Sequence, residues 1–286
     1  MLPPDADRVV FSTDCVTIGA FRCPATHPSF HNSGPIRDDC FVFPRTAVVI
    51  AHDRARPFVA DPTMITLYNR QQQYERRAVG ANGDRCDWFA VSPDVLRGAL
   101  RDRDPAAAGS VRPIRFMHAP SDAATYLAQR RLFVEASGTA PAGSLAVEER
   151  VVALLDRVLM LAYGDRQSRQ ASTRVAQDAD LADAAKCWIA PRAARRLTLT
   201  AIARAVDCSV FHLCRAFRRA TGLTLHAYRD ELRLRAGLER LEAGERDLSR
   251  LALDLGYSSH SHFTAAFRQR FGTPPSSARK LLIVRD

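Results

Sequence analysis

The fold is decided by two stretches that share one pattern: LTLTAIARAVDCSVFHLCRAFRRATG at residues 197–222 and DLSRLALDLGYSSHSHFTAAFRQRFG at residues 247–272. In each stretch, a short segment with apolar residues at helical spacing runs into a polar turn. A second helical segment then begins on a serine and ends at a glycine. The sequence therefore predicts two helix–turn–helix units, and the apolar spacing over residues 225–241 predicts one long helix that joins them.

The ends of the predicted helices carry the residues that helix ends prefer. Ser209 fits the N-cap of the second helix in the first unit, and either Ser258 or Ser259 fits that position in the second unit. Gly222 and Gly272 fit the left-handed position that follows a helix. A helix–turn–helix unit can place its second helix in the major groove of DNA while the first braces it, so the repeat favours double-stranded DNA as a partner.

The charge of the chain is distributed unevenly. The 286 residues carry a formal net charge of +10, and nearly all of that excess lies from Cys187 onward, in the part that holds the repeated pattern. A basic segment of this kind neutralises phosphates. A solvated basic face with no partner is the alternative, but it does not explain the repeat.

Composition excludes several other classes. No run of about 18 apolar residues is present, so no membrane span is expected, and the N-terminus lacks a basic segment followed by an apolar run, so no secretory signal is expected. The seven cysteines are an odd number without an export signal, which argues against a disulfide framework and predicts a cytoplasmic protein with reduced thiols.

The front part of the chain, residues 16–117, has the pattern of a β-domain. Short apolar or alternating runs recur between prolines and polar turns: VTIGAF, CFVFP, AVVIAH, MITLY, CDWFAV and IRFM. Closely spaced strands without long helices between them predict an antiparallel sandwich or barrel. Ser92, followed by Pro93, predicts the start of a short helix.

A long amphipathic helix is expected at residues 145–164. One apolar stripe runs along it, and either packing on the β-domain or self-association explains the stripe. The polar segment 165–178 lacks periodicity and is the expected linker. The expected domains are therefore 1–164, 165–178 as linker, and 179–286. The stripe consists of Val147, Val151, Leu154, Leu155, Val158, Leu159 and Ala162.

Over roughly the last hundred residues, the sequence resembles the AraC/XylS family of bacterial transcription regulators. Two departures are Gly237, inside the joining helix, and Ala278, where the family motif has an aromatic residue. The front half resembles, more loosely, the cupin-like sensor domains of that family. The matching residues are Ile202, Ala203, Ser209, Leu213, Arg215, Phe217, Arg218, Thr221, Gly222, Tyr228, Arg233, Arg235, Ala236, Leu251, Ala252, Gly256, Tyr257, Ser258, Ser261, Phe263, Phe267, Arg268, Phe271, Gly272 and Pro275.

The resemblance implies an α+β protein with two domains. The first is a cupin-like β-barrel or sandwich with following helices, and the second is an all-α DNA-binding domain with two helix–turn–helix units joined by a long helix. It implies a sequence-specific transcription regulator that binds promoter DNA and responds to a small-molecule effector or another signal. RNA polymerase is a further candidate partner. The apolar stripe before the linker leads us to expect a homodimer.

Base-reading residues are expected on the exposed, N-terminal half of each second helix. Arg215 is the strongest candidate, because arginine can donate two hydrogen bonds to guanine; contact with phosphate alone is the alternative. The expected base readers are Phe211, His212, Cys214 and Arg215 in the first unit and His260, Ser261, Thr264 and Ala265 in the second. Those expected to hold phosphates are Arg218, Arg219, Arg268, Arg270 and Arg279.

One constellation in the front half has the residue types of a metal site. Thiolate and imidazole are the ligands that zinc prefers, which makes a structural zinc ion or a metal or redox sensor the chemical interpretation. The spacing matches no short zinc motif, and ordinary buried thiols and histidines are the alternative. The residues are Cys23, His27, His31, Cys40 and Cys86.

A metal-dependent enzyme of the cupin type with a DNA-binding tail is the competing function. Such enzymes present clustered histidines and a carboxylate to a metal. The expected strands here offer only isolated histidines, His52 and His118. This spacing favours a sensor over a reaction centre, so we expect no catalytic residues.

Overall fold

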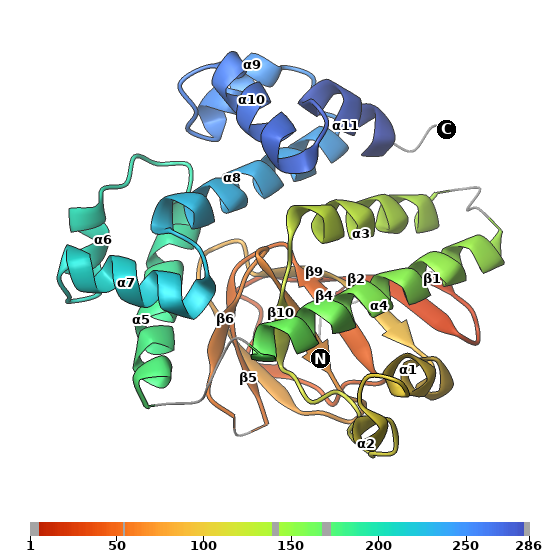
Figure 1. Ribbon diagram of the computed structural model, residues 1–286. Coiled ribbons are helices and arrows are strands. Elements are labelled where there is room, and N and C mark those ends of the chain that lie inside the picture. The colour runs from red at the N-terminus through yellow and green to blue at the C-terminus, as the bar shows by residue number, and fades with distance from the viewer. Residues whose placement is uncertain (1–5, 54, 139–142, 168–172, 283–286) are drawn as a thin grey trace. The chain divides into compact units, whose positions relative to one another are not determined.

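The computed structural model describes residues 6–53, 55–138, 143–167 and 173–282. The chain divides into two compact units, which we call the N-terminal unit (Met1–Ser168) and the C-terminal unit (Arg169–Arg285). Figure 1 shows the β-rich character of the first and the all-helical character of the second. Within the described residues, no helix is both long and apolar enough to cross a membrane.

Two antiparallel sheets form the N-terminal unit. Within its described residues, the larger sheet has the strand order β1-β2-β9-β4-β7-β10 and the smaller sheet the order β3-β8-β5-β6. The strands are β1 (Asp7–Ser12), β2 (Val16–Cys23), β3 (Asn32–Ser33), β4 (Cys40–Pro44), β5 (Val48–His52), β6 (Phe58–Ala60), β7 (Met64–Tyr68), β8 (Tyr74–Ala78), β9 (Asp84–Val91) and β10 (His118–Pro120).

Five of the six predicted runs are strands, and the sixth is not. The run at residues 114–117 precedes β10. The side chain of Asn69 accepts a hydrogen bond from the backbone N–H of Ile114 (2.9 Å) and donates one to its carbonyl oxygen (2.8 Å). These two backbone groups are therefore satisfied by a side chain, where a strand would satisfy them through a neighbouring strand.

The inner strands β4 and β7 of the larger sheet are buried on both faces, because their side chains alternate between two apolar layers. On β4, Phe41 and Phe43 belong to the cluster that includes the helices of the unit. Cys40 and Val42 face the other way and pack with residues that include Tyr74 of the smaller sheet. The expected sandwich is confirmed, and its likeness to a cupin stays a prediction.

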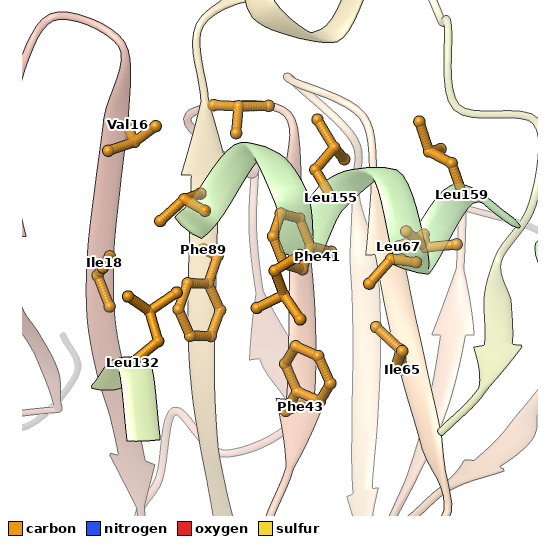
Figure 2. Packing of buried hydrophobic residues seen from close by; sticks show 14 of the residues in the cluster. Val16, Ile18, Phe41, Phe43, Ile65, Leu67, Phe89, Leu132, Leu155 and Leu159 are labelled. Atoms are coloured by element: carbon orange, nitrogen blue, oxygen red, sulfur yellow. The ribbon is translucent and has the colours of Figure 1, made fainter. Parts of the chain in front are cut away.

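Helices cover the outer face of the larger sheet. They are α1 (Pro93–Leu100), α2 (Pro105–Ala108), α3 (Ala123–Ala136) and α4 (Ser144–Gln167). Ser92 caps α1 and Pro93 opens it, as expected. Figure 2 shows Leu155 of α4 beside Phe41 of β4, and Leu159 on the side of Leu67 of β7. All seven residues of the predicted apolar stripe are buried in this cluster, so the packing alternative is correct and the stripe is intramolecular core.

Helices are the regular elements of the C-terminal unit in its described residues. Its elements are α5 (Thr173–Ile189), the short 3-10 helix η1 (Ala190–Arg192), α6 (Leu199–Ala205), α7 (Val210–Thr221), α8 (Leu225–Glu242), α9 (Leu248–Asp254), α10 (His260–Phe271) and α11 (Pro275–Leu282). The predicted joining helix is α8, and the two predicted helix–turn–helix units are α6–α7 and α9–α10.

The expected linker, residues 165–178, is wrong at both ends. Residues 165–167 belong to α4, and α5 begins at Thr173. Residues 168–172 lie outside the described part of the chain. Asp178 is buried and paired with Arg219 of α7. This pairing and the packing of α5 on α7 explain why residues 173–178, which lack aromatic residues and local periodicity, are nevertheless helical.

Candidate nucleic-acid interface

The first helix–turn–helix unit is built on one apolar cluster. Ile202 of α6 and Leu213 and Phe217 of α7 are buried against α5 and the start of α8. Ser209 caps α7 by accepting a hydrogen bond from the backbone N–H of His212 (3.2 Å). Gly222 ends the helix with φ of 74°, as the sequence predicted. This packing turns one face of α7 inward, and the opposite face lies in solvent.

The second helix–turn–helix unit also packs its second helix through a buried apolar row, but the turn before that helix is one residue longer than in the first unit. Ser259 is the N-cap of α10, so it is the correct one of the two candidate serines. Phe263, Phe267 and Phe271 form a buried row of ring contacts along α10. They are core residues, as expected.

Two glycines allow the second unit to pack closely. A Cβ at Gly237 of α8 would lie 3.0 Å from Cδ1 of Leu255 and 3.2 Å from Cε2 of Phe263. The glycine that departs from helix preference therefore lets α8 approach the second unit. Gly256 has φ of +78°, and a Cβ there would lie 2.1 Å from the carbonyl oxygen of Ala194.

The predicted base readers lie on the solvent side of the two recognition helices, α7 and α10. Phe211, His212 and Arg215 are exposed and Cys214 is half-buried. On α10, His260, Ser261 and Ala265 are exposed and Thr264 is half-buried. These four α10 residues line one open surface hollow together with Arg268 and Gln269. Gln269 was missed by the sequence analysis, although it directly follows Arg268 on the same helix.

Arg215 is positioned by an aromatic neighbour. Its guanidinium carbon lies 5.3 Å from the ring centroid of Phe211, one helical turn earlier on α7. A cation over an aromatic face is attracted by the ring. Among the described residues, no carboxylate pairs with Arg215, so its donors are available to a partner outside the chain.

Arg219 and Arg270, which the sequence assigned to phosphates, are each paired with a carboxylate of the protein itself. Arg219 of α7 donates two hydrogen bonds to Asp178 of α5, from Nε to Oδ2 (2.7 Å) and from Nη2 to Oδ1 (2.8 Å). Arg270 of α10 forms an ion pair with Glu231 of α8. The carboxylates of Asp178 and Glu231 are both largely buried, and leaving a buried charge unpaired is costly. These pairs therefore hold each recognition helix to its supporting helix.

Arg218 and Arg268 remain as the phosphate candidates on the recognition helices. They occupy equivalent positions, nine residues after the N-caps Ser209 and Ser259, and both are exposed. In the described part of the chain, neither has a carboxylate partner. Arg279 lies outside the recognition helices, and its Nη1 donates to the carbonyl oxygen of Glu245 (3.2 Å).

The Cys–His constellation of the front half does not converge. Cys23 is opposite Asp84 of β9 in the sheet register, and Cys40 is opposite Ala90. Those β9 positions are about 20 Å apart at about 3.3 Å per residue. Within the described residues, no three His, Cys, Asp or Glu side chains are grouped so that they could hold a metal ion. The structure therefore contradicts the zinc interpretation.

The thiols themselves behave as core groups. Burial raises the pKa of Cys40 and of Cys86 well above the ordinary range, and it raises that of Cys23 as well. These environments favour the protonated thiol. Cys23 and Cys40 are buried in apolar clusters, while His31 is exposed. The alternative of ordinary buried thiols agrees with this structure.

The paired helix–turn–helix units define a DNA-binding protein, and comparisons with known proteins agree. A family model described as "Helix-turn-helix domain" matches residues 202–281. The regulatory protein SoxS of Escherichia coli (strain K12) is 34% identical over 95 residues, which are 33% of this chain and 89% of SoxS. The transcriptional regulator GlxA of Rhizobium meliloti is 40% identical over 88 residues, which are 30% of this chain and 26% of GlxA.

The chain belongs to the AraC/XylS family of transcription regulators. It is a sequence-specific DNA-binding regulator, and nothing in these relatives supports the enzyme alternative. Among solved structures, ToxT from Vibrio cholerae is 11% identical with a TM-score of 0.38, covering 94% of this chain and 99% of that one. Likeness at that level supports no inference about ligands or assembly.

Proposed function

We propose that the chain regulates transcription by inserting α7 and α10 into successive major-groove segments on one face of promoter DNA. The observation that carries this proposal is the matched placement of the two helices. Each buries an apolar row, caps its N-terminus with a serine and leaves an exposed arginine, Arg218 or Arg268, at the same position. Helices used in this way read segments about 34 Å apart, which is one turn of the duplex.

The exposed side chains of α7 and α10 fall into two groups: those that contact base edges and those that contact phosphates. Phe211, His212, Cys214 and Arg215 of α7 contact base edges in this proposal, as do His260, Ser261, Thr264 and Ala265 of α10. Arg218 and Arg268 hold phosphates and fix the register without reading sequence. Arg219 and Arg270 are left out of the contact because each is paired with a carboxylate of the fold.

The N-terminal unit receives the signal in this proposal. Support comes from the layer between its two sheets, where His52 is 1% exposed and neither ring nitrogen has a hydrogen-bond partner within the described residues. Phe58 and Tyr68 lie against the imidazole ring. A buried polar group without a partner is unfavourable, and a small-molecule effector with hydrogen-bonding groups would relieve it.

A homodimer is the proposed assembly, with a revised contact. The buried stripe of α4 is not accessible, but Leu145, Val152 and Met160 on the outer side of that helix are 67%, 40% and 52% exposed. A second copy packed on this row would bring two DNA-binding modules to neighbouring sites and raise the affinity through linkage. In this proposal the protein also contacts RNA polymerase at the promoter. It is located in the cytoplasm.

Selection from a random duplex pool tests the proposed function. The full chain is expected to enrich two short sequence blocks about one helical turn apart, with affinity that falls steeply as salt rises. The double substitution of Arg218→Ala and Arg268→Ala is expected to weaken binding to all sequences. Enrichment of no sequence, or of a single block only, would contradict the proposal.

A further inference from the structure

Three arginines, which we call the arginine row, lie side by side at one end of the larger sheet. In the pairing of β2 with β9, Arg22 is directly opposite Arg85. Arg45 follows the last residue of β4 on the other side of β9, and its backbone N–H donates to the carbonyl oxygen of Arg85 (2.7 Å). Side chains that are directly opposite in an antiparallel pair have Cβ atoms about 4.5–5.5 Å apart. The backbone therefore holds the three positive charges close together.

The arginine row belongs to the helix-covered face of the sheet. Residues two or four apart on a strand share a face, so Arg22 is on the face of Ala20, and Arg85 is on the face of Phe89. Ala20 and Phe89 both belong to the apolar cluster under the helices. The row thus lies beyond the end of that cluster, where Arg22 is exposed and Arg85 is half-buried. A solute can reach it from the solvent side.

Asp87 is the carboxylate beside the arginine row. It is fully buried, its Oδ1 lies 3.8 Å from Nη1 of Arg45, and its Oδ2 accepts a hydrogen bond from Nη1 of Arg130 on α3. Across the sheet, Asp87 is opposite Ala20, which in turn is opposite Arg8 of β1. Arg8 therefore adds a further positive charge next to the row. One carboxylate that two arginines already share does not neutralise this group.

The positive charges of this group act on one another. Burial lowers the pKa of Arg22, the charges of Arg85, Arg45 and Arg8 lower it further, and Asp87 acts in the opposite direction. Like charges directly opposite each other destabilise an antiparallel pair of strands. An anion bound at the arginine row would replace that repulsion with attraction, so it would stabilise the folded N-terminal unit.

The charge of the row favours a phosphate group over a single carboxylate. A guanidinium is planar and can donate two parallel hydrogen bonds to either kind of oxyanion. A phosphate monoester carries a charge of about −1.5 to −2 at pH 7 and three strong acceptor oxygens, whereas a carboxylate carries one charge. The larger charge and the additional acceptor match a site at which Arg22, Arg85 and Arg45 converge.

We propose that the arginine row binds the phosphate group of a small molecule. Arg22 and Arg85 contact the phosphate oxygens, and Arg45 links the site to the buried Asp87. The site is separate from the layer around His52, because the row lies on the helix-covered face of the larger sheet and His52 lies between the two sheets. It also belongs to the N-terminal unit, so it does not depend on how α7 and α10 contact DNA.

The first test titrates inorganic phosphate into the full chain at constant ionic strength and measures binding by calorimetry. The wild type is expected to bind phosphate saturably. Arg22→Ala is expected to weaken that binding about tenfold or more, since it removes hydrogen bonds between charged groups. Arg22→Lys is expected to recover part of the loss, because lysine keeps the charge without the planar fork. No saturable binding by the wild type, or equal binding by Arg22→Ala, would overturn the proposal.

Two control variants locate the bound phosphate. Arg77→Ala removes an exposed arginine of β8 in the smaller sheet, and it is expected to bind phosphate as the wild type does. The double variant Arg218→Ala with Arg268→Ala removes the phosphate candidates of the recognition helices, and it is also expected to keep the binding. Loss of phosphate binding in the double variant would place the anion on the DNA-binding surface and would overturn the proposal. Circular dichroism checks that each variant is folded.

Competition with acetate and with DNA distinguishes the other anions. Acetate at the same ionic strength is expected to displace phosphate poorly, and equally good displacement would make the row a carboxylate site. Arg22→Ala is expected to keep the wild-type DNA affinity and its salt dependence. A flattened salt dependence in this variant would assign the row to the DNA backbone. Either result would overturn the proposal while leaving the proposed function intact, because selection of DNA sequences by the wild type is measured separately.

Discussion

Arg219 and Asp178 form a two-fold hydrogen-bonded ion pair, with Nε–Oδ2 and Nη2–Oδ1 distances of 2.7 and 2.8 Å. The pair ties the recognition helix α7 to α5, and the Asp178 side chain is only 7% exposed. Hydrogen bonding to Asp178 raises the pKa of Arg219, so the arginine stays charged. A basic residue in the middle of an arginine-rich segment thus serves the fold, while its neighbour Arg218 faces solvent.

Arg219→Ala is expected to lower the stability of the C-terminal unit, because it removes two charge-assisted hydrogen bonds from the buried carboxylate of Asp178. The slope of DNA affinity against salt concentration is expected to stay unchanged, since Arg219 releases no counterion from DNA. Chemical unfolding and a salt titration of binding measure the two quantities. A flattened salt slope at unchanged stability would show that Arg219 contacts phosphate after all.

Arg268→Ala is expected to behave in the opposite way. The side chain is exposed on α10 and no carboxylate pairs with it among the described residues, so stability should change little. Affinity should fall alike for specific and non-specific duplexes, and the salt slope should decrease by about one unit. Arg218→Ala, at the equivalent position of α7, is the matched comparison. A loss confined to one sequence would make Arg268 a reader.

Gly256→Ala is expected to destabilise the C-terminal unit strongly. The residue has φ of +78°, and a Cβ would lie 2.1 Å from the carbonyl oxygen of Ala194. Gly222→Ala is the control, because φ there is +74° and no atom lies within 4 Å of a Cβ. The control bears only the cost of the left-handed conformation, about 1–2 kcal/mol. Equal losses of unfolding free energy in the two variants would mean that the backbone clash is relieved.

Leu155→Glu is expected to unfold the N-terminal unit, because Leu155 is 2% exposed within the core that Figure 2 shows and an unpaired charge cannot be buried there. Leu155→Ala should cost about 2–5 kcal/mol. Val152→Glu with Met160→Glu, on the exposed side of α4, should leave the unit folded and should dissociate the proposed dimer. Sedimentation gives the oligomeric state. An unchanged dimer would place the contact elsewhere.

Burial lowers the pKa of His52 to about 4 from an ordinary value of 6.5. The folded state thus favours the neutral ring. The stability that this preference gives the folded state is fully present above about pH 6.5, and it is lost as the pH falls toward 4. The wild type is expected to lose about 2 kcal/mol between pH 7 and pH 5 from this residue. His52→Phe, measured in the same denaturant series, removes that component. Identical pH dependence in both proteins would show that His52 is not buried as a neutral group.

The sequence predicted the features that local pattern determines. The serine N-caps, the glycine at each helix end and the joining helix depend on residues that lie only a few positions apart in the sequence. The partners of Arg219 and Arg270 are not, because Asp178 and Glu231 lie on other helices and only tertiary packing brings them near. The metal interpretation of the cysteines was wrong for a similar reason: strand register separates Cys23 from Cys40, and spacing along the chain does not reveal register.

Hydroxyl-radical footprinting of the full chain on its selected duplex tests the central claim most directly. Two recognition helices in successive major-groove segments should protect two patches on the same face of the DNA, with centres about 10 base pairs apart. Arg215→Ala should weaken only the patch under α7. A single protected patch, or two patches on opposite faces of the duplex, would contradict the account.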